Sequence, residues 1–264
     1  MHGRPGDHPD GQSPTDRLWL LAGTGEGPTL AAALLEAGWW LRVSVVAPEA
    51  ARAYPPHPRL QLQVGALADP AAVRAVLQEL NPRWVIDATH PFALRISALL
   101  EQVLAPLQQP RLRLARPALA GRGEVLGGLQ ELRRLDLRGE RLLLAIGSRQ
   151  LPQALAASNA AAHFARVLDR PLSLQLARAA GLADNHLACL RPDPSAGGAL
   201  ERALCRRWRI SAVLCRRSGG AAEGLWQAVA QELGLRLLQL ERPPEPGRAE
   251  ALPLQALLEK LGRP

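Results

Sequence analysis

Short apolar runs alternate along the chain with segments of helical periodicity. Residues 18–22 form an uninterrupted apolar run that stops at Gly23, which is typical of a buried parallel strand. Residues 28–37 carry apolar side chains at helical spacing, Gly38 follows as a C-cap, and residues 41–46 form the next apolar run. This order predicts a strand–helix–strand unit.

The same alternation continues to the end of the chain and predicts two successive α/β lobes of the Rossmann-like, doubly wound type, each with a mainly parallel sheet. Because ligands bind at the carboxyl ends of such strands, we expect a ligand cleft between the lobes. We place a disordered tail at 1–17, a dinucleotide-binding lobe at 18–125 and a second α/β lobe at 126–264. The further predicted strands are 60–64, 84–86, 111–114, 142–146, 163–167, 186–189, 212–215 and 236–240, and the further predicted helices are 71–80, 94–104, 129–135, 172–180, 199–208 and 221–233.

The composition predicts a globular cytoplasmic protein. Hydrophobic residues make up 47% of the 264 positions and charged residues 21%, which is enough apolar material for a substantial core. The N-terminus lacks an apolar signal segment and no run is long enough to span a membrane. The three cysteines, Cys189, Cys205 and Cys215, lack the spacing of a zinc site or a disulfide framework, so we expect buried thiols and no metal.

The formal net charge of +8 comes almost entirely from arginine, since Lys260 is the sole lysine. The arginines are scattered and aromatic residues are only 3%, a pattern that does not favour nucleic-acid binding. A small polyanion is the expected partner, although arginine enrichment from coding bias remains an alternative reading. We expect a monomer or a weak homodimer.

The first strand–helix turn, Gly23-Thr24-Gly25-Glu26-Gly27, is a candidate phosphate site. Glycines let the backbone approach a phosphate, and the free amides at a helix N-terminus attract it. The spacing departs from GxGxxG, because Pro28 stands where the third glycine would be; a plain tight turn is the alternative.

Glu49 follows the second strand, at the position that faces the adenosine ribose in dinucleotide sites. An acidic side chain there accepts from a ribose 2′-hydroxyl and repels a 2′-phosphate, so it favours NADH over NADPH. Arg52 is near enough in sequence to reverse the preference, and a solvated loop glutamate is the alternative interpretation.

The strand at 84–86 leads into Asp87-Ala88-Thr89-His90-Pro91-Phe92-Ala93. This segment gathers donors, acceptors and one group that titrates near neutrality at the mouth of the predicted sheet. Asp87 is a candidate cofactor-binding residue, and Thr89 and His90 are candidate catalytic residues. A structural histidine is the alternative for His90.

Two segments of the second lobe are candidate anion sites. Arg149 follows a strand and a glycine at a predicted helix start, and Arg216 and Arg217 precede the glycine turn Ser218-Gly219-Gly220. A solvated flexible loop is the alternative for the latter.

Together these motifs resemble the precorrin-6A reductases, including the cobalt-precorrin-6A reductases. The resemblance spans about 18–243, and its most specific motif is Asp87–Ala93. Gly23-Thr24-Gly25-Glu26, Ile146-Gly147-Ser148-Arg149, Ser218-Gly219-Gly220 and Glu241-Arg242-Pro243 match further family motifs in the same order.

The chain departs from the family pattern at several of these positions. Ala22 and Pro28 differ from the residues often found around the first turn, and Arg216 and Arg217 replace a lysine and an asparagine. Ala47-Pro48-Glu49 stands where the family often has Ala-Gly-Arg, which puts a preference for NADPH in doubt.

The resemblance implies that NADPH or NADH delivers hydride to a carbon–carbon double bond of a tetrapyrrole polycarboxylate in cobalamin biosynthesis. With this family in view, we expect cofactor contacts at the two glycine turns, at Asp87 and, from its position after the second strand, at Glu49. We expect reaction-centre contacts at Thr89 and His90, and carboxylate or pyrophosphate anchors at Arg149, Arg216 and Arg217.

Two alternatives remain at the level of the sequence. Another α/β reductase would need a Tyr-x-x-x-Lys pair or a comparable acid, but Tyr54 is the sole tyrosine and Lys260 is far from it in sequence. A nonenzymatic dinucleotide sensor would bind the cofactor without oxidising it.

Overall fold

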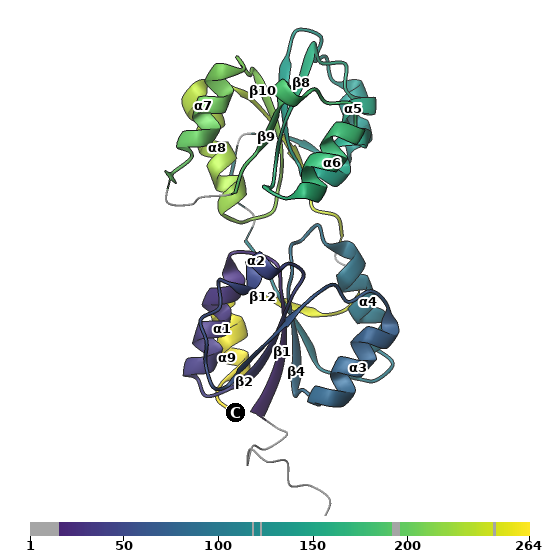
Figure 1. Cartoon of the computed structure of the whole chain (residues 1–264), viewed down its shortest axis with the longest axis vertical. Coiled ribbons are helices and arrows are strands. Elements are labelled where there is room, and N and C mark those ends of the chain that lie inside the picture. Colours follow the sequence, from purple (N-terminus) through teal and green to yellow (C-terminus); the bar gives the residue numbers. More distant parts are fainter. Residues whose placement is uncertain (1–15, 118, 122, 192–195, 245–246) are drawn as a thin grey trace, which may run out of the picture. The chain divides into compact units, whose positions relative to one another are not determined.

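The computed structural model describes residues 16–117, 119–121, 123–191, 196–244 and 247–264. The described residues divide into two compact units. Unit 1 contains the residues up to Arg116 and those from Pro244 onward, and unit 2 contains Pro117 to Pro243. Each unit is built on one parallel sheet flanked by helices (Figure 1), which confirms the predicted α/β fold class.

Unit 1 has the strand order β12-β5-β4-β1-β2-β3, and every pair in it is parallel. Its topological switch point, where the strand order reverses, lies between β1 and β4. The strands are β1 (Arg17–Ala22), β2 (Trp40–Val45), β3 (Leu60–Val64), β4 (Trp84–Ala88), β5 (Arg111–Leu114) and β12 (Glu250–Leu252), and the helices are α1 (Glu26–Glu36), α2 (Pro48–Ala51), α3 (Pro70–Leu80), α4 (Leu94–Leu104) and α9 (Leu254–Leu261).

Unit 2 has the order β6-β11-β10-β7-β8-β9, again with parallel pairs, so its switch point lies between β7 and β10. Its strands are β6 (Glu124–Leu126), β7 (Arg141–Ala145), β8 (Ala162–Val167), β9 (Leu187–Cys189), β10 (Ala212–Arg216) and β11 (Arg236–Leu240), its α-helices are α5 (Leu151–Ala157), α6 (Pro171–Ala179), α7 (Ala199–Arg207) and α8 (Ala221–Leu233), and its 3-10 helices are η2 (Leu129–Arg134), η3 (Ser148–Gln150) and η4 (Asp184–His186).

Local sequence signals account for the helix ends in unit 1. The side chain of Asp69 accepts a hydrogen bond from the Ala72 amide at 2.8 Å, and Pro70 occupies the first turn of α3. Asn81 ends this helix in the left-handed region at φ 46°. Gly38 follows α1 at φ +104°, a conformation that favours glycine, as the sequence predicts.

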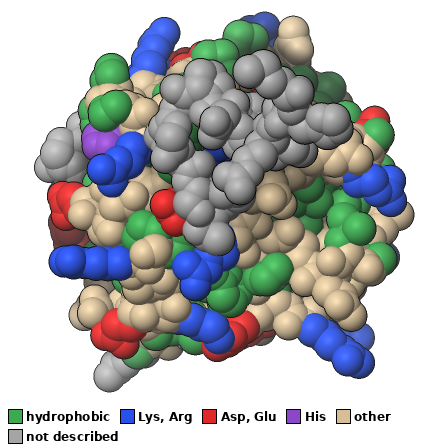
Figure 2. Space-filling view, turned by 90° about the horizontal axis from the view of Figure 1, so that it is seen from below, with side chains coloured by type: hydrophobic (Ala, Val, Ile, Leu, Met, Phe, Trp, Pro, Cys, Tyr) green, Lys and Arg blue, Asp and Glu red, His purple; other side chains and the backbone are tan. Residues whose placement is uncertain are grey.

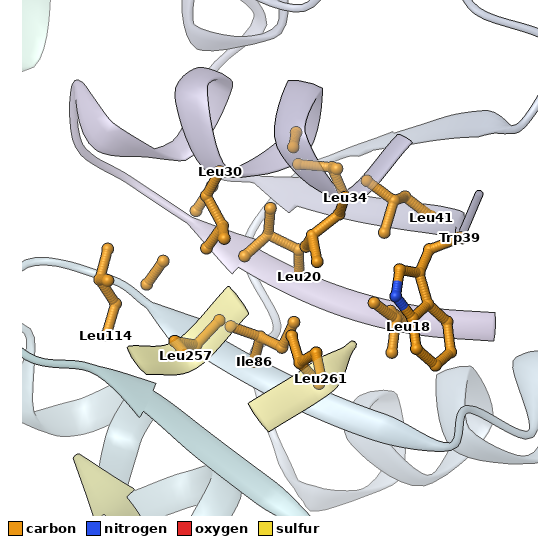
Figure 3. Packing of buried hydrophobic residues seen from close by; sticks show 14 of the residues in the cluster. Leu18, Leu20, Leu30, Leu34, Trp39, Leu41, Ile86, Leu114, Leu257 and Leu261 are labelled. Atoms are coloured by element: carbon orange, nitrogen blue, oxygen red, sulfur yellow. The ribbon is translucent and has the colours of Figure 1, made fainter. Parts of the chain in front are cut away.

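The core of unit 1 lies on both faces of its sheet. Leu30 and Leu34 of α1 and Leu257 and Leu261 of α9 pack with β1 and β4 on one face (Figure 3). Side chains of α3 and α4 cover the other face. Trp39, which is fully buried, donates its indole N–H to the Gly262 carbonyl at 2.9 Å and so ties the C-terminal segment to the first helical layer.

The C-terminal segment corrects the domain division expected from the sequence. Residues 126–264 do not form one lobe, because β12 pairs with β5 and α9 buries its leucines in unit 1. The transition into unit 2 falls at 116/117 rather than at 125/126, since β6 already belongs to the second sheet. The tail expected at 1–17 lies outside the described residues except for its last two positions, and Arg17 begins β1.

Two strands run further than the sequence pattern indicates. The strand expected at 84–86 continues to Ala88, and the one expected at 212–215 continues to Arg216. Both strands end at or near a charged residue, Asp87 or Arg216. The prediction stopped before that residue because it followed the apolar run. As a result Asp87 and Arg216 lie inside strands and not in the loops that follow.

Candidate active site at the carboxyl ends of the strands

Two of the sequence-predicted motifs meet at the switch point of unit 1. Gly23 directly follows β1 and Thr89 directly follows β4, and a Cβ placed on Gly23 would lie 4.0 Å from the Thr89 Cα. The Thr24 hydroxyl donates to the Ala88 carbonyl at 3.4 Å. The first glycine turn and the Asp87–Ala93 motif therefore form one continuous surface, at the position where open α/β sheets bind ligands.

The N-terminus of α1 is built for a close approach. No side chain caps this helix, and a Cβ on Gly25 would meet nothing within 4 Å. A Cβ on Gly27, by contrast, would lie 2.4 Å from the Tyr54 hydroxyl and 2.9 Å from the Ala22 Cβ. Gly27 is thus required for packing, whereas Gly25 leaves open space in front of the helix amides.

Glu26 does not cap the helix, because Arg116 draws its carboxylate away. The Arg116 Nη2 lies 3.0 Å from the Glu26 Oε2, and the Arg116 side chain is almost fully buried. Arg116 follows β5 in the chain and was not among the residues that the sequence singled out. The pairing offsets the one negative charge in the first turn of α1.

Asp87 is a correction to the sequence prediction, which placed it in contact with a cofactor. Its side chain is completely buried, and Arg113 Nη1 lies 2.6 Å from its Oδ2. The Ser97 hydroxyl donates to the same oxygen at 2.7 Å, and the Thr89 amide and hydroxyl donate to Oδ1 at 3.0 and 2.7 Å. Asp87 holds Thr89 and does not face solvent.

Ser97 and Arg113 were missed by the sequence reading. For Arg113, the sequence signal is the alternation Arg111-Leu112-Arg113-Leu114, because a strand inside a sheet rarely has two arginines on one face. Arg113 is 3% exposed and its Nη1 also donates to the Ser97 hydroxyl at 3.1 Å.

His90 lies half-buried in the turn before α4. Its Nδ1 accepts a hydrogen bond from the Phe92 amide at 3.1 Å, and its carbonyl accepts from the Ala93 amide. With Nδ1 acting as an acceptor, the neutral ring carries its proton on Nε2.

Glu49 lies in the first turn of α2, just past the end of β2, and its side chain is exposed. Arg52, at the end of the same short helix, is exposed as well. The structure thus leaves Glu49 accessible beside the carboxyl end of β2.

The switch point of unit 2 has a half-buried arginine at its centre. Arg216, the last residue of β10, donates from Nε and Nη2 to the Gln150 Oε1 at 3.1 and 2.7 Å. Burial lowers the pKa of Arg216 to about 10, so the side chain keeps its charge at neutral pH. Gly147, at φ +85°, packs against this guanidinium, and Arg149 is exposed one residue before Gln150.

The second glycine turn is closed by a carboxylate. Glu223 is 1% exposed, and its Oε2 accepts the Gly219 amide at 2.6 Å. The side-chain amides of Gln227 and Gln239 donate to its Oε1 at 3.1 and 3.2 Å. Ser218 is buried, so only Gly219 and Gly220 of this motif are partly exposed.

Arg217 lies beside a small hollow of about 90 Å³ that is lined by Arg217, Glu223, Glu241 and Arg242. Its Nη1 pairs with Glu241 at 2.7 Å, and Arg242 donates to the Arg217 carbonyl at 2.7 Å. Within unit 2 the structure thus brings Arg216 next to the Gly147–Gln150 turn and Arg217 next to the Glu241-Arg242 segment.

The remaining titratable candidates are not placed for chemistry. Burial raises the pKa of the Tyr54 hydroxyl to about 12, and it raises the pKa of Cys205 to about 11 and of Cys215 to about 12. Cys205 and Cys215 are buried, as expected, and Cys189 is half-buried. None of the described helices is long and apolar enough to cross a membrane.

Comparison with known proteins agrees with these motifs. The model of the precorrin-6x reductase CbiJ/CobK family matches residues 17–261. A cobalt-precorrin-6A reductase of a Synechocystis strain is 34% identical over 86% of this chain and 88% of its own length. A precorrin-6A reductase of Mycobacterium tuberculosis is 31% identical over 89% of this chain and 93% of its own.

Among solved structures, a CobK precorrin-6A reductase superposes with a TM-score of 0.75 at 24% sequence identity. The superposition covers 95% of this chain and 99% of that one. The fold found here, including both sheets, is therefore shared along nearly the whole of both chains.

Proposed function

The chain belongs to the precorrin-6x reductase family, and from this premise we propose how its two units divide the work of the reaction. The protein is an oxidoreductase that reduces a tetrapyrrole precursor in cobalamin biosynthesis with a nicotinamide cofactor. The proposal assigns the dinucleotide to the switch point of unit 1 and the carboxylates of the macrocycle to arginines of unit 2. It rests on the contrast between the open space at the start of α1 in unit 1 and the half-buried guanidinium of Arg216 in unit 2.

The first glycine turn holds the pyrophosphate in this proposal. Among the described residues no side chain caps α1, and the space beside Gly25 is open. Because the Gly27 amide donates to the Thr24 carbonyl at 3.2 Å and Pro28 has no amide hydrogen, the amides of Gly25 and Glu26 are the ones proposed to face the phosphate. The pairing of Glu26 with Arg116 keeps the nearest acidic charge from opposing it. Ser218-Gly219-Gly220, the other candidate turn, suits a pyrophosphate less, because Glu223 already places a carboxylate against the Gly219 amide.

Glu49 selects between the two cofactors. Its exposed carboxylate beside the end of β2 accepts from a ribose 2′-hydroxyl and repels a 2′-phosphate, so NADH is favoured over NADPH. Affinities for NADH and NADPH, measured for the wild type and for Glu49→Gln, test this. We expect the substitution to reduce the preference for NADH by about tenfold, the worth of one charge-assisted hydrogen bond. Tighter binding of NADPH by the wild type would refute it.

Arg149, Arg216 and Arg217 bind the peripheral carboxylates of the macrocycle. Guanidinium groups pair with carboxylates through parallel hydrogen bonds, and Arg216 is already oriented by Gln150. Arg217 has an acidic neighbour in Glu241, so we expect it to contribute less than Arg216. The net charge of +8 draws a polyanionic substrate to the protein.

The bound dinucleotide supplies the hydride, and the side chains at the end of β4 orient the reacting groups. Thr89 is held by two hydrogen bonds to a buried carboxylate, which fixes it at the mouth of the sheet. His90 follows Thr89 in the same turn, where its Nδ1 accepts from the Phe92 amide, and we place its ring near the reacting centre. Neither residue needs to react covalently, because the cofactor carries the chemistry.

Absorbance of the reduced nicotinamide at 340 nm, followed with purified protein and precorrin-6A or its cobalt form, tests the activity. We expect oxidation of the cofactor that depends on both protein and tetrapyrrole. Cofactor binding without oxidation by either tetrapyrrole would instead support the dinucleotide-sensor alternative. Another α/β reductase chemistry that uses Tyr54 as its acid conflicts with the burial of that side chain.

For the state of the protein in the cell, we propose a cytoplasmic monomer or weak homodimer that binds no nucleic acid. On the face that Figure 2 shows, lysine and arginine side chains lie singly or in small groups among acidic and apolar ones. This scattered arrangement supports the proposal that the protein binds no nucleic acid. Light scattering and a gel-shift assay with DNA and RNA test the two parts separately.

A further inference from the structure

The carboxylate of Asp87 is surrounded by donors in the interior of unit 1. Its Oδ2 faces Arg113 Nη1 at 2.6 Å and the Ser97 hydroxyl at 2.7 Å. Its Oδ1 accepts the Thr89 amide at 3.0 Å and the Thr89 hydroxyl at 2.7 Å. Exposed fractions of 0% for Asp87, 1% for Ser97 and 3% for Arg113 show that solvent does not compete for these contacts.

This arrangement decides the polarity of the Thr89 hydroxyl. A carboxylate can only accept hydrogen bonds, so the Thr89 hydroxyl proton points to Asp87. The hydroxyl oxygen then has two lone pairs. One faces Arg113 Nη1 at the long distance of 3.4 Å, and no other hydrogen bond to this oxygen is made by the described residues. Because Thr89 is half-buried at the end of β4, a ligand at the switch point can reach this oxygen.

We infer that Thr89 acts as a hydrogen-bond acceptor for a neutral N–H group, with Asp87, Ser97 and Arg113 as its positioning residues. The matching chemistry is an amide or pyrrole N–H, found on the carboxamide of a nicotinamide and on the nitrogens of a tetrapyrrole. Thr89 is then not the donor of the proton that balances the hydride, because its own proton is committed to Asp87. The inference rests on the proposed binding of the dinucleotide in unit 1.

Two sources of the N–H group are separated by the choice of ligand. The first arm measures binding of the reduced cofactor and of its 3-acetylpyridine analogue, in which a methyl group takes the place of the carboxamide NH2 group. If Thr89 accepts from the carboxamide, wild type binds the natural cofactor about tenfold more tightly, and Thr89→Val removes this difference. The second arm measures KM for the tetrapyrrole. If Thr89 accepts from a pyrrole N–H, Thr89→Val raises that KM about tenfold and leaves the cofactor discrimination intact.

Thr89→Ser and Thr89→Ala serve as companion variants. Serine keeps the hydroxyl and its contact with Asp87, so it should behave as the wild type in both arms. Alanine removes the hydroxyl without adding bulk, so it should reproduce the effect of valine and covers the case in which valine disturbs folding.

The positioning role is tested with Ser97→Ala and Arg113→Lys. Each should weaken the cofactor or substrate discrimination assigned to Thr89, and the pH dependence of turnover should stay as in the wild type. Arg42→Lys is the matched control, since Arg42 is another buried arginine of the same sheet whose partners, Gln61 and Glu79, do not contact Thr89. It should leave the discrimination unchanged.

The outcomes separate this inference from the proposed function. Dinucleotide binding by the wild type, with discrimination and tetrapyrrole KM both unchanged in Thr89→Val and Thr89→Ala, would overturn the acceptor role while leaving the proposed function standing. A wild-type protein that binds neither reduced nor oxidised dinucleotide would refute the proposed function, and the carboxamide hydrogen bond with it.

Discussion

Five strands follow the same order in both units, β5-β4-β1-β2-β3 and β11-β10-β7-β8-β9, but side chains of opposite charge lie at the two switch points. In unit 1 the centre is Asp87, a buried carboxylate at the end of β4. In unit 2 the corresponding strand, β10, ends in Arg216, a largely buried guanidinium. Among the described residues neither α1 nor α8 has a side-chain cap at its N-cap residue, but in the turn before α8 the Gly219 amide donates to the buried Glu223 carboxylate.

This comparison shows that topology places a site and the side chains decide what it binds. Parallel strands on both sides of a switch point leave a crevice at their carboxyl ends whatever their sequence. In unit 1, Asp87 and Glu26 pair with Arg113 and Arg116. In unit 2, Glu223 accepts the Gly219 amide, and Arg216 donates to Gln150, a neutral side chain. Units of similar fold can thus take different ligands.

The largest expected effect is a difference in stability between two variants, each of which removes one arginine at a switch point. Arg113→Gln leaves the carboxylate of Asp87 buried without its counter-charge, which should cost about 3–5 kcal/mol of unfolding free energy. Arg216→Gln leaves the neutral amide of Gln150 without its donor and should cost about 1 kcal/mol. Urea unfolding followed by circular dichroism measures both. Equal losses would mean that the two centres are not electrostatically distinct.

A second test addresses the packing under the first glycine turn. Gly27→Ala places a methyl group 2.4 Å from the Tyr54 hydroxyl and should lower the unfolding free energy by about 1–3 kcal/mol. It should also weaken dinucleotide binding, because α1 must shift. Tyr54→Phe in the same background removes the clashing oxygen and should restore part of both losses. No recovery would place the strain elsewhere.

The carboxylates at the two helix starts provide a third test. Glu223→Ala deprives the Gly219 amide and two glutamine side chains of their acceptor, so a loss of about 2 kcal/mol in unfolding free energy is expected. Glu26→Ala removes a partly exposed carboxylate and should cost less than about 1 kcal/mol. Thermal and urea unfolding midpoints show which variant loses more stability. A larger loss in Glu26→Ala than in Glu223→Ala would contradict the stabilising role assigned to Glu223 in the second turn.

The smallest effect concerns acid stability in unit 2. The half-buried His163 of β8 has its pKa lowered below 6.5 by burial, and its Nε2 has no hydrogen-bond partner among the described residues. Below about pH 6.5 the unfolded chain therefore protonates His163 more readily than the folded protein does. The free energy of unfolding should decrease as the pH is lowered through this range. His163→Gln should flatten this slope. His57→Gln, at an exposed histidine of unit 1, is the control and should leave it unchanged.

Hydrogen exchange of β7 and β8 peptides, measured at pH 7 and pH 5, reports on this region directly. Faster exchange at pH 5 in the wild type, but not in His163→Gln, is the expected pattern. An equal acceleration in both proteins would assign the acid sensitivity to other groups.

Much of the fold could be predicted because buried strands and amphipathic helices leave strong periodic signals. The limits of α4, β5, α8 and β11 agree with the prediction residue for residue. Several short elements were not predicted, among them α2, β6, β12 and α9. The strands β6 and β12 have three residues each, too few for a recognisable alternation. Helix α9 does carry leucines at helical spacing, but nothing local indicates that they pack in unit 1.

The candidate site was predictable at its motifs but not in its interior. The glycine turn and the Asp87–Ala93 segment stand out because unusual residues follow apolar runs. Ser97 lies 10 residues from its partner Asp87 in sequence, and Arg113 lies 16 residues from its partner Ser97. Only the pairing of β4 with β5 and the packing of α4 bring these three residues together.

By itself, the sequence determined the α/β class, the order of the strands along the chain and the turns that could face a ligand, because these depend on local periodicity and residue type. The tertiary structure alone decided that the C-terminal helix returns to unit 1, that Asp87 faces inward and that Glu223 closes the second turn. Those outcomes depend on contacts between segments distant in sequence, whose burial determines which charges are paired and which remain available to bind.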